Sequence, residues 1–194
     1  MREFQLAAAR WAAQPIGIER LPDFARLPPC IEDGATFEEN AIRKARHYGP
    51  YAPGLLFADD SGLEVEALDG APGIYSARFS GPRATDASNN QLLLEKLRGV
   101  ENRAGRFLCA IALVEGARLL GVYRGMVEGR ILEEPRGSGG FGYDPLFYCP
   151  ALECSFGEAA EERKWAVSHR GQAFRAMLAA LLPDVAENAP EAAR

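Results

Sequence analysis

The feature that most constrains the fold is the run of residues 55–63, LLFADDSGL, in which four apolar residues lead directly into two carboxylates. A short apolar run that follows a Pro-Gly pair is typical of a buried strand. We therefore expect a strand with Asp59 and Asp60 at its carboxyl end, where α/β sheets bind ligands. Adjacent acids repel and are costly to desolvate, which favours a cation or a proton as their partner. A solvated turn, with Asp59 as a cap and Asp60 in water, fits these residues equally well.

Length and charge narrow the class of protein. We expect one α/β domain over residues 1–194, with 1–182 as its core and 183–194 as a tail. The net charge of −5 argues against nucleic acid as a partner. The four cysteines show no zinc-ligand spacing with a histidine, and no apolar segment reaches the ~18 residues of a membrane span. No signal peptide is recognised, so we expect a cytoplasmic protein.

Apolar periodicity and capping residues predict the main elements. A helix is expected to begin within a residue or two of Met1, and a second to follow a capping box at Thr36 and Glu39 and to reach Tyr48. Ser168 is expected to cap the last helix. The other expected elements are a half-exposed strand at 63–67, a helix at 86–97 capped by Asp86, an antiparallel hairpin of strands 107–114 and 119–126, and a last helix ending near 182.

Several polar residues have both a structural and a functional interpretation. The capping box alone explains Glu39, and Lys44 fits an ordinary solvated helix lysine. Residues 136–145, RGSGGFGYDP, form a glycine-rich loop that lets the backbone approach a ligand, although such loops are common. His169 and Arg170 fall in the first turn of a helix, where a cation is unfavourable without an anionic or polar partner. That position favours a functional role for them.

Five blocks, taken together and in order, closely resemble one family. The chain resembles the inosine/xanthosine triphosphate pyrophosphatases (ITPase-like), which remove non-canonical purine nucleotides, from about residue 2 to residue 182. The blocks are TFEENA at 36–41, ADDSGL at 58–63, APGIYSAR at 71–78, GGFGYDP at 139–145 and SHRG at 168–171.

The resemblance implies a fold and an activity. The fold is a two-lobed α/β structure with an elongated mixed β-sheet flanked by helices, and the active site lies in the cleft between the lobes. The activity is Mg²⁺-dependent hydrolysis of a purine nucleoside triphosphate (ITP, dITP or XTP) to the monophosphate and pyrophosphate, usually by a homodimer. By resemblance, Asp60 is the proton acceptor and, with Glu39, a metal ligand. The implied substrate contacts are Lys44, Ser61, Phe141, Gly142, Tyr143, Asp144, Lys164, His169 and Arg170.

The physical chemistry of these side chains agrees with the implied roles. Pyrophosphate cleavage needs charge neutralisation and a positioned water, which a hard cation on carboxylates supplies. Successive side chains of an extended strand alternate faces, so we expect only one of Asp59 and Asp60 to be a ligand and the other to support it. An acceptor at Asp144 and a donor at Arg170 suit the N1–H and 6-oxo groups of hypoxanthine and xanthine, whereas adenine presents the reverse pattern.

One block of the family is not found. Its members open with a strand and a Thr/Ser-x-Asn-x-x-Lys turn that holds the triphosphate, whereas Arg2-Glu3-Phe4 fits the helix that follows that turn. We expect the missing block to lie in the upstream reading frame, and we expect residues 1–194 alone to bind and turn over nucleotide poorly. The alternative is a catalytically impaired, nucleotide-binding paralogue. Pyrophosphate release from inosine triphosphate, by this chain and by an upstream-extended form, separates the two.

Overall fold

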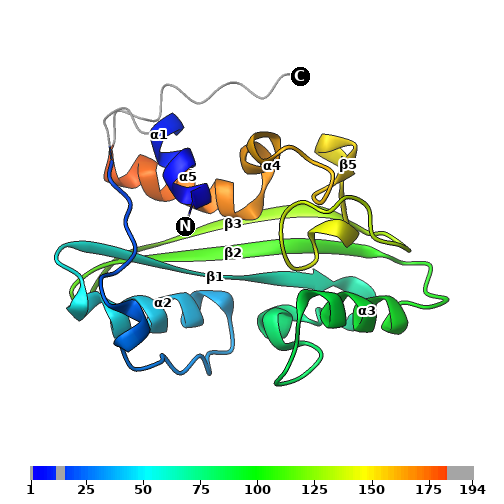
Figure 1. Cartoon of the computed structure of the whole chain (residues 1–194), viewed down its shortest axis with the longest axis horizontal. Helices are drawn as coiled ribbons and strands as arrows, with labels where there is room; N and C mark the ends of the chain where they lie inside the picture. Colours follow the sequence, from blue (N-terminus) through cyan, green and yellow to red (C-terminus); the bar gives the residue numbers. More distant parts are fainter. Residues whose placement is uncertain (1, 12–15, 183–194) are drawn as a thin grey trace.

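An antiparallel sheet forms the centre of the molecule (Figure 1). The computed structural model describes residues 2–11 and 16–182, and within them five strands pair in the order β1-β2-β3-β4-β5. The strands are β1 (Leu55–Val65), β2 (Ala104–Glu115), β3 (Arg118–Ile131), β4 (Phe147–Cys149) and β5 (Cys154–Ser155).

Helices cover both faces of the sheet. Helices α1, α4 and α5 lie on one face, and α2 and α3 lie on the other (Figure 1). The expected α/β class, with an elongated sheet flanked by helices, is confirmed. Every pairing between the described strands is antiparallel, so the parallel pairing that a mixed sheet requires is not among them. The helix bounds are α1 (Arg2–Trp11), α2 (Phe37–Tyr48), α3 (Asp86–Lys96), α4 (Glu161–Val167) and α5 (His169–Leu181).

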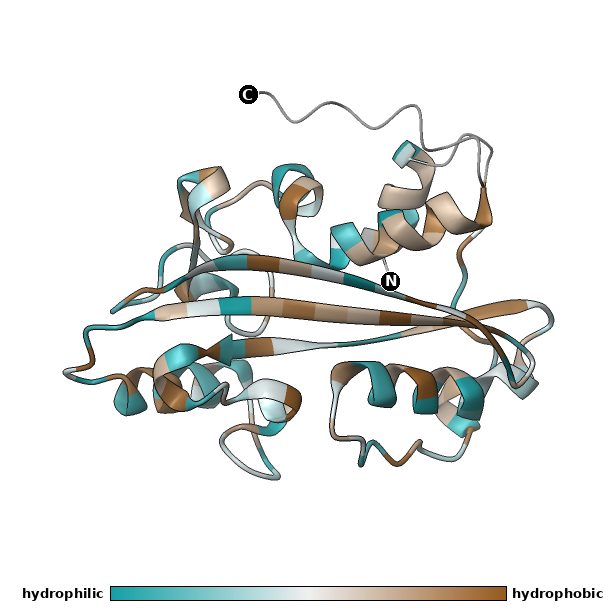
Figure 2. Cartoon of the chain, turned by 180° about the vertical axis from the view of Figure 1, so that it is seen from behind, coloured by the Kyte–Doolittle hydropathy of each residue, from teal (hydrophilic) through white to brown (hydrophobic). Residues whose placement is uncertain are grey.

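The expected hairpin is confirmed and is longer than the apolar runs indicated. Strand β2 is buried from Cys109 to Val114, which explains its nearly continuous apolar sequence, visible in the middle of the sheet in Figure 2. Strands β2 and β3 pair from Ala104↔Arg130 to Glu115↔Arg118. Gly116 in the turn has φ 56°, a left-handed conformation that glycine adopts without steric cost.

The two acids lie inside a strand, which corrects both sequence-based interpretations. Strand β1 pairs with β2 continuously from Leu55↔Glu115 to Val65↔Gly105, so Asp59 and Asp60 stand in its middle and not at its carboxyl end or in a turn. The strand continues because Leu63 and Val65 are fully buried in the core and hold the chain extended.

Helix caps agree with the sequence in part. The Thr36 hydroxyl accepts a hydrogen bond from the Glu39 N–H, as expected, but the Glu39 carboxylate accepts from the Ala35 N–H, so the reciprocal capping box does not form. Helix α3 is capped by Thr85, with a reciprocal bond to Ser88, and not by Asp86. Ser168 caps α5 as expected, accepting from the Gly171 N–H at 3.1 Å.

The remaining expectations concern the core, the termini and the membrane. Residues 2–11 are helical, as the spacing of Phe4, Ala7 and Ala8 predicted, and these three side chains are buried. The tail at 183–194 lies outside the described residues. Among the helices of residues 2–11 and 16–182, no helix is long and apolar enough to cross a membrane.

Candidate active site

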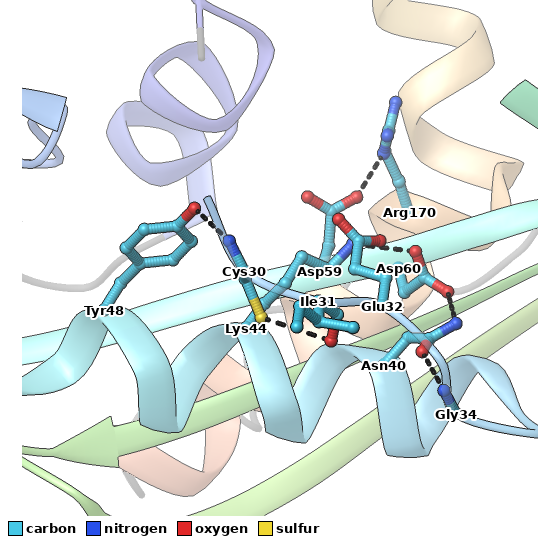
Figure 3. Close-up of polar contacts among 10 residues, drawn as sticks. All are labelled: Cys30, Ile31, Glu32, Gly34, Asn40, Lys44, Tyr48, Asp59, Asp60 and Arg170. Carbon is cyan, nitrogen blue, oxygen red and sulfur yellow. Dashed lines mark hydrogen bonds and ion pairs between the residues drawn. The ribbon is translucent and has the colours of Figure 1, made fainter. Parts of the chain in front are cut away.

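Asp60 is held from helix α2. Its Oδ1 atom accepts a hydrogen bond from the Lys44 ammonium at 2.7 Å, and its Oδ2 atom accepts one from the Asn40 amide at 3.3 Å (Figure 3). Asn40 and Lys44 are four residues apart, so the helix presents both on the face that packs on β1. The cation that the adjacent acids were expected to need is, for Asp60, the Lys44 ammonium, so Lys44 is not an ordinary solvated helix lysine.

Glu32 belongs to the same cluster, although sequence reasoning missed it. Its Oε2 atom lies 3.0 Å from Lys44 Nζ, so Lys44 stands between two carboxylates (Figure 3). Contacts with the last turns of α2 hold the irregular segment that carries Glu32. The Cys30 N–H donates to the Tyr48 hydroxyl at 3.1 Å, and a His47 ring nitrogen lies 2.9 Å from the Pro28 carbonyl oxygen.

Burial and charge act against each other in this cluster. Burial raises the pKa of Asp60 and the Glu32 charge raises it further, which together outweigh the lowering by Lys44 and Asn40. Burial lowers the pKa of Lys44, but the bonds and charges of Asp60 and Glu32 outweigh this, so its pKa is raised and the ammonium stays charged. Asp60 is thus a carboxylate of increased basicity beside a fixed cation.

Asp59 points to the opposite face of β1 and meets the other half of the site. Its Oδ2 atom accepts a hydrogen bond from Arg170 Nε at 2.8 Å (Figure 3). Arg170 lies in the first turn of α5, so a carboxylate meets this cation. The expectation that the two neighbouring acids separate across the strand is confirmed. Ser61, two residues beyond Asp59, is on the same face of β1.

The glycine-rich loop is built around Asp144. This residue is 2% exposed, and its Oδ2 atom accepts from Lys164 Nζ at 2.5 Å and from the Phe141 N–H at 2.7 Å. Phe141 is 46% exposed, and its ring centroid lies 5.0 Å from Lys164 Nζ and 4.7 Å from Arg170 Cζ. The Phe141 ring is therefore within cation–π distance of both Lys164 and Arg170.

The next two residues hold the loop to the body of the protein. Tyr143 is 4% exposed and its hydroxyl donates to the Ser76 carbonyl at 2.8 Å, so its side chain belongs to the core. The Gly142 N–H donates to Asp86 at 2.7 Å, and the Gly142 carbonyl accepts from Asn90 at 2.9 Å. Sequence reasoning did not find Asp86, Asn90 or Ser76 as parts of the site, because each lies more than 50 residues from the loop residue that it contacts.

His169 is a neutral, buried base. Its ring stacks on Phe107 with centroids 4.7 Å apart and planes 11° apart, and the side chain is almost fully buried. Burial lowers its pKa well below the ordinary histidine value, and the charges of Arg170 and Lys164 lower it further. Its Nδ1 atom is buried without a hydrogen-bond partner in the described part of the chain.

Arg170 connects the two halves, since it bonds Asp59 and lies over Phe141. One half contains Asp60, Lys44 and Glu32, and the other contains the loop with its cations. Glu39 is directed to the Ala35 N–H, and no contact between it and Asp60 is seen in the described part of the chain. Within residues 2–11 and 16–182, no group of three or more His, Cys, Asp or Glu side chains is close enough to hold a metal unaided. Two surface hollows lie elsewhere in the described structure, one lined by residues between 91 and 103 with Glu133, the other by residues 101–104, 129–134 and Arg136.

The α/β fold therefore carries one polar site, in which a partly buried acid–lysine–acid cluster is joined by an arginine to a glycine-rich loop. The chain belongs to the Ham1 family, whose model matches residues 1–180. This confirms the family that the five sequence blocks indicated.

Named relatives and solved structures agree with this assignment. The chain is 50% identical over 171 residues to a dITP/XTP pyrophosphatase of an Exiguobacterium species, covering 87% of each chain. It is 53% identical over 164 residues to a dITP/XTP pyrophosphatase of Thermus thermophilus, covering 82% of this chain and 77% of the relative. A HAM1 protein from Coxiella burnetii superposes with a TM-score of 0.82 at 40% identity, over 93% of this chain and 91% of that one.

Proposed function

We propose that the protein hydrolyses non-canonical purine nucleoside triphosphates (ITP, dITP and XTP) to the monophosphate and pyrophosphate. The relatives named dITP/XTP pyrophosphatase support the substrate class. The observation that carries the proposal is the separation of Asp59 and Asp60. One acid faces a lysine and a second acid, and its neighbour anchors the arginine beside the loop. Strand β1 thus joins the cluster of Asp60, Lys44 and Glu32, proposed to face the phosphates, to the glycine-rich loop, proposed to face the base.

We propose Mg²⁺ as the cofactor, and the donor set fits it. All the candidate side-chain ligands are carboxylates, the oxygen donors that a hard cation prefers, and Mg²⁺ commonly uses only one or two of them together with water and substrate phosphates. A bound Mg²⁺ would neutralise phosphate charge and make a bound water more acidic. Asp60 is the first expected ligand. We propose Glu32 as the second ligand, because it contacts the same Lys44 ammonium as Asp60. Glu39, which accepts from the Ala35 N–H, remains a metal ligand predicted from the family resemblance alone.

The proton of the attacking water goes to Asp60. Hydrogen bonds from Lys44 and Asn40 hold this carboxylate in place for that role. The Lys44 ammonium, held in place by Asp60 and Glu32, orients that carboxylate and supplies positive charge near the phosphates. We propose the remaining predicted contacts, Ser61, His169 and Arg170 among them, as groups on the base and sugar side.

Base selection follows from the donors and acceptors of the loop. The Asp144 carboxylate already accepts hydrogen bonds from Lys164 and from the Phe141 N–H, so its main role is to order the loop. Arg170, whose guanidinium lies over the Phe141 ring, is the group proposed to meet the 6-oxo side of the purine. Adenine carries an amino group there and would leave such donors unpaired, which can cost several orders of magnitude in kcat/KM, roughly 10⁴.

The test is a nucleotide panel assayed for its products. Purified protein with Mg²⁺ is given dITP, XTP, dATP or dGTP. The nucleotide product is identified, and orthophosphate is measured with and without added inorganic pyrophosphatase. We expect the products formed from dITP and XTP to be monophosphate and pyrophosphate in equal amounts. We expect kcat/KM to be lower for dATP and dGTP than for dITP and XTP, and we expect no activity with excess EDTA. Release of orthophosphate with nucleoside diphosphate would contradict the proposed bond cleavage.

We also propose that the protein acts as a cytoplasmic homodimer, on the family resemblance. Sedimentation equilibrium across a range of protein concentrations tests the dimer. A single species at the monomer mass of 21.1 kDa at micromolar concentration would contradict it.

A further inference from the structure

Two residues of α3 hold both backbone polar groups of Gly142. Asp86 accepts from the Gly142 N–H at 2.7 Å, and the Asn90 amide donates to the Gly142 carbonyl at 2.9 Å. Asp86 and Asn90 are four residues apart, so they lie on one face of α3. We call these two hydrogen bonds the grip on Gly142. Because they hold the N–H and the C=O of one residue, they restrain the peptide planes on both of its sides.

Gly142 is the point in the loop where such a grip matters most. Its φ is +60°, and a Cβ added there would meet nothing within 4 Å, so packing does not restrain this backbone. The flanking residues are closed on each other: the Phe141 N–H donates to the Asp144 carboxylate, and the Asp144 N–H donates to the Phe141 carbonyl at 3.2 Å. The bonds from α3 therefore tie this closed turn to the rest of the protein.

Helix α3 is itself fixed to the strand that carries the acids. The Asn89 amide donates to the Ser76 carbonyl at 3.2 Å, the same carbonyl that accepts from Tyr143. The Ser76 hydroxyl in turn accepts from the Leu63 N–H at 2.9 Å, three residues beyond Asp60. The 3₁₀ segment η4 (Gly73–Arg78) and α3 thus form a buried bridge from β1 to the loop.

One feature of Asn90 is not explained by stability. Its Oδ1 atom is buried and has no hydrogen-bond partner within the described residues. A buried acceptor without a partner is unfavourable for folding. An apolar residue of similar size would avoid this, so the amide is better explained by its bond to Gly142.

We propose that Asp86 and Asn90 are positioning residues that set which purine is accepted, by fixing where residues 141–144 present their base-side groups. This inference rests on the proposed pyrophosphatase function. Neither residue is expected to touch the phosphates or the attacking water. Loss of the grip should therefore raise KM and weaken base discrimination, and leave kcat largely intact.

The test uses near-isosteric variants. Asn90→Asp turns the donor that faces the Gly142 carbonyl into an acceptor, Asp86→Ala removes the acceptor, and Asp86→Asn keeps an oxygen acceptor without the charge. Gln91→Ala is the control, because this exposed residue of the same helix pairs only with Glu95 in the described structure. For each protein, kcat and KM are measured for dITP and dGTP, and amide hydrogen exchange is measured for peptides covering 136–146.

We expect Asn90→Asp and Asp86→Ala to lower the dITP-to-dGTP ratio of kcat/KM about tenfold, the effect of losing one hydrogen bond, with kcat for dITP within about twofold. Exchange at 136–146 should accelerate in both variants. Asp86→Asn should stay near the unsubstituted protein, and Gln91→Ala should change neither quantity.

Hydrogen exchange, the kcat/KM ratio and pyrophosphate release each test a different part of the proposal. Unchanged exchange in Asn90→Asp contradicts the grip, and an unchanged ratio with faster exchange contradicts its role in specificity. Failure of the unsubstituted protein to release pyrophosphate from either nucleotide would instead refute the proposed function, and the exchange data would still decide whether α3 holds the loop.

Discussion

Asp59 and Asp60 are neighbours in β1 whose carboxylates bind cations on opposite faces of the sheet. Asp60 accepts from Lys44 of α2 at 2.7 Å, and Asp59 accepts from Arg170 of α5 at 2.8 Å. Because one peptide bond joins the two acids, the positions of the two cations are coupled through the backbone of β1. A nucleotide that spans both sides would find its phosphate and base contacts preset in relative position.

Replacing Asp60 with Asn should remove pyrophosphate release while leaving the fold intact. The amide keeps the shape of the side chain but cannot accept the proton of the attacking water. Loss of a general base lowers the rate by about 10²–10⁴-fold. The measurement is single-turnover release from dITP, with circular dichroism as the check on folding. Activity close to that of the unsubstituted protein would falsify the assignment of Asp60.

Asp59→Asn is the matched comparison, and it should act on binding. The Arg170 guanidinium would lose an anionic partner, so we expect KM for dITP to rise by about tenfold, as for one charge-assisted bond, with a smaller effect on kcat. Steady-state kinetics of the two variants side by side checks this. Equal losses of kcat in both would mean that the acids do not have separate roles.

Much of the fold could be predicted because its signals are local. Helix α5 follows from the cap at Ser168 and an apolar stripe, and the β2–β3 hairpin follows from two apolar runs around Glu115-Gly116. The position of the acids could not be predicted in this way. A glycine after two acids is typical of a turn, and only the burial of Leu63 and Val65 against partners far along the chain keeps the strand extended.

The candidate site likewise contains residues that the sequence indicated and residues that only the folded chain reveals. The family resemblance indicated Asp60, Lys44 and Arg170, which the structure brings together in two linked clusters. Glu32 has no local signal, because it lies in an irregular proline-rich segment and reaches the site only through Lys44. Tyr143 is the opposite case. It lies in a motif associated with substrate binding, but its ring is buried in the core, so its side chain is not presented to a ligand.

The buried pair of Lys164 and Asp144 should be far more sensitive to the loss of one partner than of both. Lys164→Met leaves the Asp144 carboxylate buried without its cation and should lower the free energy of unfolding by about 3–5 kcal/mol. Adding Asp144→Asn should restore much of that loss, because the amide oxygen still accepts from the Phe141 N–H. Urea denaturation of the two single variants and the double variant completes the cycle. Additive losses would show that the two side chains act independently.

His169 should make the fold sensitive to mild acid. Its folded pKa lies well below its unfolded value of about 6.5, so the unfolded chain binds the extra proton. The stability that it contributes is full above about pH 6.5 and falls by ~1.4 kcal/mol per pH unit as the pH drops toward the folded pKa. Denaturation midpoints between pH 7.5 and 5.5 measure this dependence.

The control for that experiment is the other histidine, since the chain has only two. His169→Gln should flatten the pH dependence above pH 5.5, whereas His47→Gln, at the partly exposed end of α2, should leave it in place. The same slope in both variants would assign the titration to another group.

Gly62, the glycine within strand β1, should not tolerate a side chain. A Cβ at this position would lie 2.4 Å from the Ser76 hydroxyl, 2.6 Å from the Gly73 carbonyl oxygen and 2.8 Å from the Phe37 ring. Since two of these atoms belong to the bridge between β1 and the loop, Gly62→Ala should cost about 1–3 kcal/mol of stability and also raise KM for dITP. Gly54→Ala, with nothing within 4 Å, should be neutral or slightly stabilising. Thermal unfolding and dITP kinetics on both variants test this, and a Gly62→Ala protein as stable and active as Gly54→Ala would show that β1 tolerates a side chain against η4.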